Sequence, residues 1–315
     1  MSVARSTIKP IEPKNDPVAG AMWVFASMAT LAGLAACAKA LAAEGMHPFQ
    51  IVFFRNLFAA LVFSPLLLTR GLALFETSQL SLYAGRCAIS LFSMLTWFYA
   101  LAVIPLGELT AISFLAPLFG TLGAIVILKE TVRARRWTAL VVGFIGALII
   151  LRPGMSPLGY GQLTALLAAM SSGLVAILVK QLTARDDPNK IVFLTHLLLV
   201  PMSLVPALFI WKWPPLSQIW LVLGMGFFAT AGHMMLVRGY AATDASLVMT
   251  FEFSKLPFAT AIAYFFFGET IDVWTWVGAI VIIASATYIA RREAQVRAAR
   301  LAERPDVPPG PPSTG

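Results

Sequence analysis

Apolar stretches long enough to cross a lipid bilayer recur along the whole chain, and they limit its fold more than any other feature. A membrane-spanning helix needs about 17 to 25 predominantly apolar residues. Ten stretches of about this length are separated by short polar or Pro- and Gly-bearing breaks, and their Leu, Ala and Met content favours helices over barrel strands. We expect spans at about 18–42, 48–68, 80–102, 108–129, 136–152, 157–180, 190–210, 218–238, 245–267 and 273–290.

The composition agrees with an all-α integral membrane protein whose main partner is the lipid bilayer. Hydrophobic side chains make up 59% of the 315 residues and charged ones 12%, against about 25% charged in soluble domains. The three histidines, His47, His196 and His233, are not at metal-ligand spacing, and the chain has no Walker A or GxSxG motif. We therefore expect no metal site, no cofactor, no catalytic residues and no ATP-driven pumping.

The basic residues predict the orientation of the chain. Arg133, Arg135 and Arg136 follow the fourth span, and the segment "RREAQVRAARLAER" follows the tenth, whereas Arg152 and Lys212 lie in loops of the opposite side. The excess of basic residues on one side places both termini in the cytoplasm. Contact of these residues with anionic lipid accounts for the net charge of +8 without nucleic acid as a partner.

An internal repeat is visible when the chain is shifted on itself. A shift of 139 residues aligns Phe114 with Phe253 and Glu130 with Glu269, and one single-residue gap adds further matches. Because five helices are an odd number, the second copy enters the membrane from the opposite side, as in many secondary transporters. We expect a cytoplasmic tail at 1–17, two inverted five-helix repeats at 18–152 and 157–290, and a basic, then disordered, cytoplasmic tail at 291–315.

Each repeat has a proline in its fourth helix and a glutamate at that helix's end, in "FLAPLFGTLGAIVILKET" and "KLPFATAIAYFFFGET". With this pattern the chain resembles the EamA-type transporters of the drug/metabolite transporter superfamily. The resemblance implies ten helices, a central solute cavity between the repeats and residence in the bacterial cytoplasmic (inner) membrane. It also implies a small organic solute such as an amino acid, a nucleoside-like compound such as S-adenosylmethionine, or a vitamin such as riboflavin; "FSKLPFA" is similar to members assigned to the last two.

Two charged residues lie deep in the ninth span. Glu252 and Lys255 are three positions apart, which would place them on one helical face and let them pair. One interpretation is a neutralised ion pair that holds the helices together. The other is that both line the transport pathway, where ionisable groups inside membranes usually occur. In the second case titration of Glu252 would couple transport to protons.

Other polar and aromatic residues are further candidates for the pathway. Arg55 is about 10 Å deep in the second span, and it serves either a structural salt bridge or an anionic solute or gate. Trp97, Tyr99 and Tyr240 are candidates to stack on a solute, with the membrane interface as the alternative place for the aromatic residues. The remaining candidates are His233 as a hydrogen-bond donor, Ser113 and Phe114 in the repeat-related fourth span, and Pro117 and Pro257 as hinges.

These features predict a secondary transporter of small organic solutes that works by alternating access. An intramembrane transferase is one alternative, and it would need polar catalytic groups clustered at one interface. A channel or structural membrane subunit is another alternative. Small residues at Ala139, Gly143 and Ala147 suit close helix packing, either within the bundle or in a homodimer.

Overall fold

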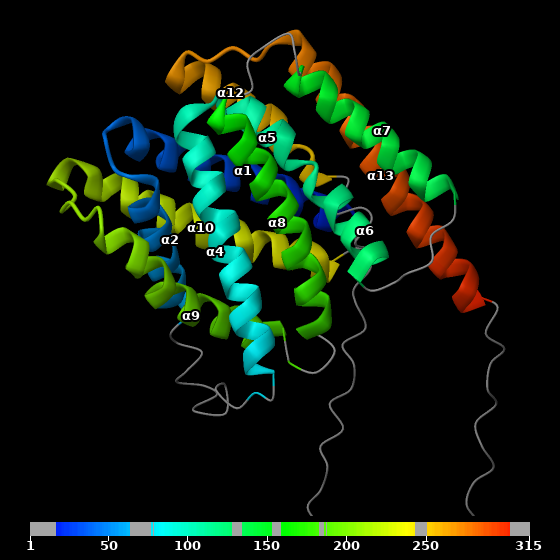
Figure 1. Cartoon of the computed structure of the whole chain (residues 1–315), viewed down its shortest axis with the longest axis horizontal. Helices are drawn as coiled ribbons and strands as arrows, with labels where there is room; N and C mark the ends of the chain where they lie inside the picture. Colours follow the sequence, from blue (N-terminus) through cyan, green and yellow to red (C-terminus); the bar gives the residue numbers. More distant parts are fainter. Residues whose placement is uncertain are drawn as a thin grey trace, which may run out of the picture.

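The protein is a bundle of α-helices in the computed structural model (Figure 1), which describes residues 17–63, 77, 79–127, 134–152, 159–182, 186, 188–242 and 251–302. Five helical stretches of the described chain are long and apolar enough to cross a membrane, one of them made of two successive helices over Leu106–Ile127, and five further apolar helices are shorter. The helices are α1 (Pro17–Ala43), α2 (Pro48–Phe63), α4 (Leu80–Val103), α5 (Leu106–Ser113), α6 (Ala116–Ile127), α7 (Ala134–Leu151), α8 (Tyr160–Leu182), α9 (Pro188–Leu208), α10 (Leu216–Ala242), α12 (Lys255–Phe267) and α13 (Val273–Ala302).

The helix contacts reflect the internal repeat, because a contact between two helices recurs between their counterparts in the other repeat. α1 packs along α10. Their counterparts in the other repeat, α8 and α4, pack along each other in the same way. α6 crosses α8 as α12 crosses α1, while α2 packs on its counterpart α9 and α7 on its counterpart α13. Figure 1 shows α7 and α13 side by side at one edge of the molecule and α4 beside α8 near its centre. The contacts are those of two inverted five-helix repeats.

Both repeats break their fourth helix at the same place. Phe114 and Leu115 form a turn between α5 and α6, and Phe253 and Ser254 form a turn directly before α12. Each turn lies two to four residues before the proline of its repeat, Pro117 or Pro257, because proline lacks the backbone donor that would continue the helix. The predicted single span at 108–129 is therefore two helices, and the chain bends before the prolines rather than at them.

The basic segment that follows the last predicted span is helical over its first part. α13 continues without a break from the apolar residues to Ala302, so the predicted tail from 291 begins as an extension of this helix. Long Arg side chains favour helix and suit the C-terminal end of a helix dipole. The predicted tail at 1–16 and the predicted disorder at 303–315 lie outside the described residues.

Candidate functional site

A cavity of about 230 Å³ lies between the α1/α10 pair and the α4/α8 pair. Both pairs contribute wall residues, and α2 and α12 add the two charged ones. The lining residues are Leu31, Leu34, Arg55, Ser93, Met94, Trp97, Phe98, Ser172, His233 and Lys255. Arg55, Trp97, His233 and Lys255, which the sequence suggests as pathway residues, thus come together from four different helices.

Trp97 is the residue that joins the cavity to both helix breaks. The Lys255 ammonium lies 5.6 Å from the centre of the Trp97 ring, within cation–π distance. The indole nitrogen of Trp97 donates a hydrogen bond to Ser113 Oγ at 3.1 Å, one residue before the first break. The two turns meet directly, because the rings of Phe114 and Phe253 stack edge to face with centroids 5.0 Å apart. Their alignment in the repeat is therefore also a contact in space.

The polar residues of the cavity have mostly neutral neighbours. Arg55 Nη1 lies 3.5 Å from Asn56 Oδ1 and 3.7 Å from Met94 Sδ. Ser93 and Ser172 join α4 to α8 through a 2.8 Å hydrogen bond between their hydroxyls. His233 Nδ1 donates to the carbonyl oxygen of Ala229 at 2.7 Å, which leaves the other ring nitrogen for further contacts.

The structure places the other predicted residues differently. Glu252 and Lys255 lie on either side of the turn at 253–254, so they do not share the face of one continuous helix, although Glu252 is within electrostatic range of Lys255. Tyr99 is 36% exposed on the outer surface of α4 and is not among the cavity-lining residues. Tyr240 belongs to α10, and its side chain lies outside the described part of the chain.

An ion pair that the sequence does not suggest closes the bundle at one end, here called the Lys39 face. Lys39 Nζ is 2.5 Å from Glu269 Oε1 and donates to the carbonyl oxygen of Ile104 at 2.8 Å. Glu269 Oε2 accepts a 2.9 Å hydrogen bond from the backbone N–H of Leu106. Gly268 precedes it in the left-handed region (φ 64°), a conformation that glycine adopts readily at a helix end. This contact links α1 and the end of α12 to the junction of α4 and α5.

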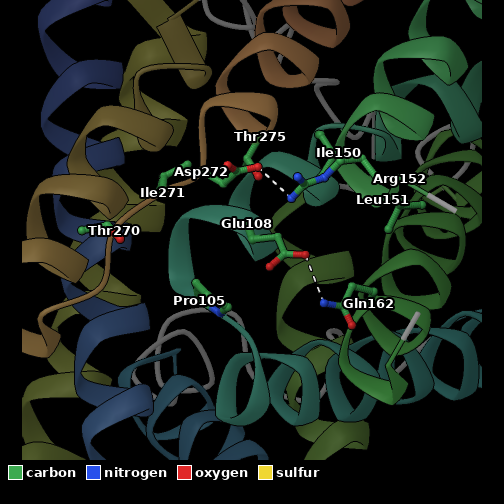
Figure 2. Close-up of a pocket in the computed structure, with 10 residues that line it drawn as sticks. All are labelled: Pro105, Glu108, Ile150, Leu151, Arg152, Gln162, Thr270, Ile271, Asp272 and Thr275. Carbon is green, nitrogen blue, oxygen red and sulfur yellow. Dashed lines mark hydrogen bonds and ion pairs between the residues drawn. The ribbon is translucent and has the colours of Figure 1, made fainter. Parts of the chain in front are cut away.

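A smaller polar pocket of about 170 Å³ lies beside this ion pair at the Lys39 face (Figure 2). Arg152 Nη2 pairs with Asp272 Oδ2 at 2.7 Å, and Gln162 Nε2 donates to Glu108 Oε1 at 3.2 Å. Figure 2 shows the Glu108 carboxylate near the middle of the pocket, between Gln162 and the Arg152–Asp272 pair. The pocket and the central cavity have no lining residue in common.

The opposite end, here called the Asp186 face, is held by one carboxylate in the connection between α8 and α9. Asp186 Oδ2 accepts hydrogen bonds from Thr77, Gln79 and Tyr83 at 3.0 to 3.2 Å. Asp186 Oδ1 lies 2.9 Å from Lys190 Nζ. These bonds tie the start of α4 to the end of α8.

The two pairs of packed helices are fastened at repeat-related positions. Gln79, directly before α4, donates a hydrogen bond to Asp186 in the connection between α8 and α9. Gln218, which lies 139 positions later at the start of α10, donates to the carbonyl oxygen of Glu44 after α1 at 3.2 Å. The same shift that aligns Phe114 with Phe253 would have identified both glutamines. Each helix pair is thereby closed at one end and is expected to move as a unit.

Replacing Asp186 by asparagine should lower the free energy of unfolding by about 2 kcal/mol at neutral pH, since hydrogen bonds to a charged group contribute about 1.5 to 3 kcal/mol. Burial alone would raise the pKa of Asp186, but the bonds from Lys190, Thr77 and Gln79 outweigh burial and hold that pKa below its ordinary value. A carboxylate with a lowered folded pKa contributes stability that is complete above its unfolded pKa, about 3.9, and disappears as the pH falls through the folded pKa.

The measurement is the melting temperature of the wild type and of Asp186→Asn in detergent across pH. The difference in melting temperature between the two proteins should stay constant from about pH 8 to pH 5 and should become smaller below about pH 4. A difference that is unchanged at pH 3 would show that the charge of Asp186 is not what stabilises this end of the bundle.

Inverted repeats, paired broken helices and a charged cavity between two helix pairs define a multi-pass membrane transporter of the secondary type. A model of the EamA-like transporter family matches residues 18–152 and, a second time, residues 159–291. The chain therefore belongs to the EamA-like transporter family, and it is a small-solute transporter.

Individual relatives match nearly the whole chain. The riboflavin transporter of Vibrio cholerae is 30% identical over 284 residues, which cover 89% of this chain and 95% of the relative. The S-adenosylmethionine uptake transporter of Rickettsia bellii is 27% identical over 256 residues, covering 81% and 88%. A crystal structure with 19% identity, covering 84% of this chain and 98% of its own, superimposes with a TM-score of 0.53 and shows the same fold.

Proposed function

We propose that this chain carries a small organic solute with a planar ring across the bacterial cytoplasmic membrane by alternating access, and that the solute binds in the central cavity. The observation that carries the proposal is that both helix pairs line the cavity and both broken helices meet beside it. A site shared by two bodies can be exposed to either side when the bodies rock against each other.

The proposed cycle has the cavity open toward the Asp186 face in this structure. At the Lys39 half, buried apolar side chains from both helix pairs form one cluster that includes Leu41, Leu101 and Met225. At the Asp186 half, the buried side chains of the described residues form two clusters, one around Tyr83 and one around Val24. With both termini cytoplasmic, the Lys39 face is periplasmic and the open side is cytoplasmic.

Trp97 and the names of the relatives support the inference that the solute contains a planar ring. The names of the two relatives described above specify riboflavin and S-adenosylmethionine, and both compounds contain a fused, planar heteroaromatic ring system. Trp97 presents an indole ring to the cavity, and stacked aromatic pairs contribute about 0.5 to 1.5 kcal/mol beyond their buried area.

The test is flux into proteoliposomes that contain the purified protein, over a panel of labelled ring-bearing vitamins, nucleosides and amino acids. We expect saturable flux of at least one ring compound, and Trp97→Leu should raise its half-saturation concentration about tenfold. Trp220→Leu is the matched control because Trp220 is 78% exposed on α10 and lies away from the cavity lining. Absence of saturable flux for every ring compound, or equal effects of the two substitutions, would contradict the proposal.

Two narrower ideas stay predictions. Coupling to protons through Glu252 predicts that an imposed pH gradient drives accumulation and that Glu252→Gln abolishes this drive while it leaves exchange of solute intact. A homodimer predicts a particle of twice the protein mass in detergent.

A further inference from the structure

The charge of the central cavity is unbalanced. Among the described residues that line it, the charged ones are Arg55 from α2 and Lys255 from the start of α12. Glu252 lies within electrostatic range of Lys255 and offsets one positive charge. One positive charge therefore remains over the described residues of the site.

The groups around Arg55 do not supply the missing negative charge. The described atoms within hydrogen-bond distance of its guanidinium are the amide oxygen of Asn56 and the thioether sulfur of Met94. Both are neutral, and the sulfur is a weak acceptor. A part-buried cation whose partners are neutral has lost part of its hydration without gaining an opposite charge, and a bound anion that makes paired hydrogen bonds to the guanidinium would offset that cost.

Lys255 is placed to act on the same ligand as Trp97. Its ammonium lies over the Trp97 ring, 5.6 Å from the ring centre, so a ligand that packs against Trp97 in the cavity is within reach of the ammonium. Ser254, the residue before Lys255, adds a buried hydroxyl oxygen without a hydrogen-bond partner among the described residues. Such a group is usually satisfied by a ligand or by water.

We propose that the solute of this transporter is an anion, a planar ring compound whose single carboxylate or phosphate monoester binds between Arg55 and Lys255 while its ring stacks on Trp97. The inference rests on the proposed function, since it names the charge of the solute that the central cavity carries. It predicts exclusion of ring compounds with a net positive charge, because Arg55 and Lys255 would repel them. The cavity of about 230 Å³ is below the range of about 300 to 1,000 Å³ for larger ligands, so one-ring probes are suitable for the test.

The experiment compares probes that share a ring and differ in charge. Nicotinate, nicotinamide and 1-methylnicotinamide are anionic, neutral and cationic versions of one ring, and pyridoxal 5′-phosphate with pyridoxal tests a phosphate in place of a carboxylate. Binding to the purified wild-type protein is measured by thermal stabilisation, and competition is measured on flux in proteoliposomes. We expect at least about tenfold tighter binding of an anion than of its neutral partner, and weaker binding still of the cation. The nicotinate series tests a carboxylate and the pyridoxal pair tests a phosphate, so comparing the two shows which group the site binds.

The charge preference should depend on the two cavity cations. Arg55→Gln and Lys255→Gln should each reduce the preference for the anion about tenfold or more. Arg86→Gln is the matched control, because Arg86 is a second arginine inside a membrane helix but bonds Thr195 of α9 outside the cavity lining. It should keep the wild-type preference. A variant that does not fold is replaced by Arg55→Lys or Lys255→Arg, which keep the charge and should keep the preference.

The outcomes separate the two proposals. Saturable flux in which neutral or cationic probes bind as tightly as the anions, or an anion preference that survives both glutamine variants, would overturn the anionic solute and leave the transporter proposal standing. Absence of saturable flux for any ring compound would overturn both.

Discussion

Replacing Glu269 by alanine should lower the free energy of unfolding by about 3 to 5 kcal/mol, because it leaves the Lys39 ammonium buried without its partner. The side chains of Lys39 and Glu269 are only 11% and 20% exposed, so the ammonium left behind would be mostly out of contact with solvent. The substitution also removes the acceptor of the Leu106 N–H. The measurement is equilibrium unfolding in mixed micelles.

The matched control for this prediction is the other ion pair of the same face. Arg152 and Asp272 have side chains that are 30% and 46% exposed, and such a pair contributes about 1 kcal/mol or less. Asp272→Ala should therefore cost little, and the double substitution Lys39→Met with Glu269→Leu should recover most of the stability lost in Glu269→Ala. Equal losses in Glu269→Ala and Asp272→Ala would contradict the assignment of Lys39 and Glu269 as the closing contact.

The same substitution should also affect transport. Lys39 and Glu269 connect α1 and the end of α12 to the α4–α5 junction, so they hold the two helix pairs together at the Lys39 face. Without this contact, opening at that face becomes more favourable, and a cysteine in the central cavity should become reactive from that side. A folded Glu269→Ala protein in which this cysteine is no more reactive than in the wild type would show that the ion pair is structural only.

Replacing Gly173 by alanine should destabilise the protein by about 3 kcal/mol or more, because the added methyl group would collide with backbone. A Cβ atom at Gly173 of α8 would lie 2.5 Å from the backbone nitrogen of Gly120 and 2.8 Å from the carbonyl oxygen of Ala116, both in α6. Backbone atoms in a packed helix cannot move aside as a side chain can, so α6 and α8 would have to separate.

Gly120 provides the control within the same helix crossing. A Cβ atom there would be 3.5 Å from its nearest neighbour, the carbonyl oxygen of Gly173, which is an ordinary contact. Gly120→Ala should thus stay within about 1 kcal/mol of the wild type. The comparison requires the unfolding free energies of both variants, and similar losses at the two glycines would disprove the close approach of α6 and α8.

The elements of the fold could be predicted from the sequence because they depend on local patterns. The apolar spans follow from bilayer thickness, and the repeat follows from a constant shift that pairs Phe114 with Phe253. The positions of the helix breaks are only approximate in such a prediction. Pro117 and Pro257 indicate that a break occurs, but the chain bends in the preceding turn, where the missing hydrogen bond would have been.

The candidate site could be predicted in part. Arg55 and Lys255 are conspicuous in sequence because charges inside membrane spans are rare. Lys39, in contrast, lies near a helix end and would be expected to extend toward the interface, yet it pairs with Glu269, 230 positions away in the chain. Which helix ends meet depends on how the two repeats pack, and no local pattern contains that information.

The most direct test of the central cavity as the solute site is the reactivity of a cysteine at position 172. Ser172 lines the cavity and is exposed, and the chain's two cysteines, Cys37 and Cys87, can be replaced by alanine to give a clean background. Ser172→Cys should react with a membrane-impermeant maleimide in vesicles that expose the Asp186 face, and a saturating transported solute should slow that reaction about tenfold. Reaction at an unchanged rate in the presence of that solute, or only from the Lys39 face, would contradict the account.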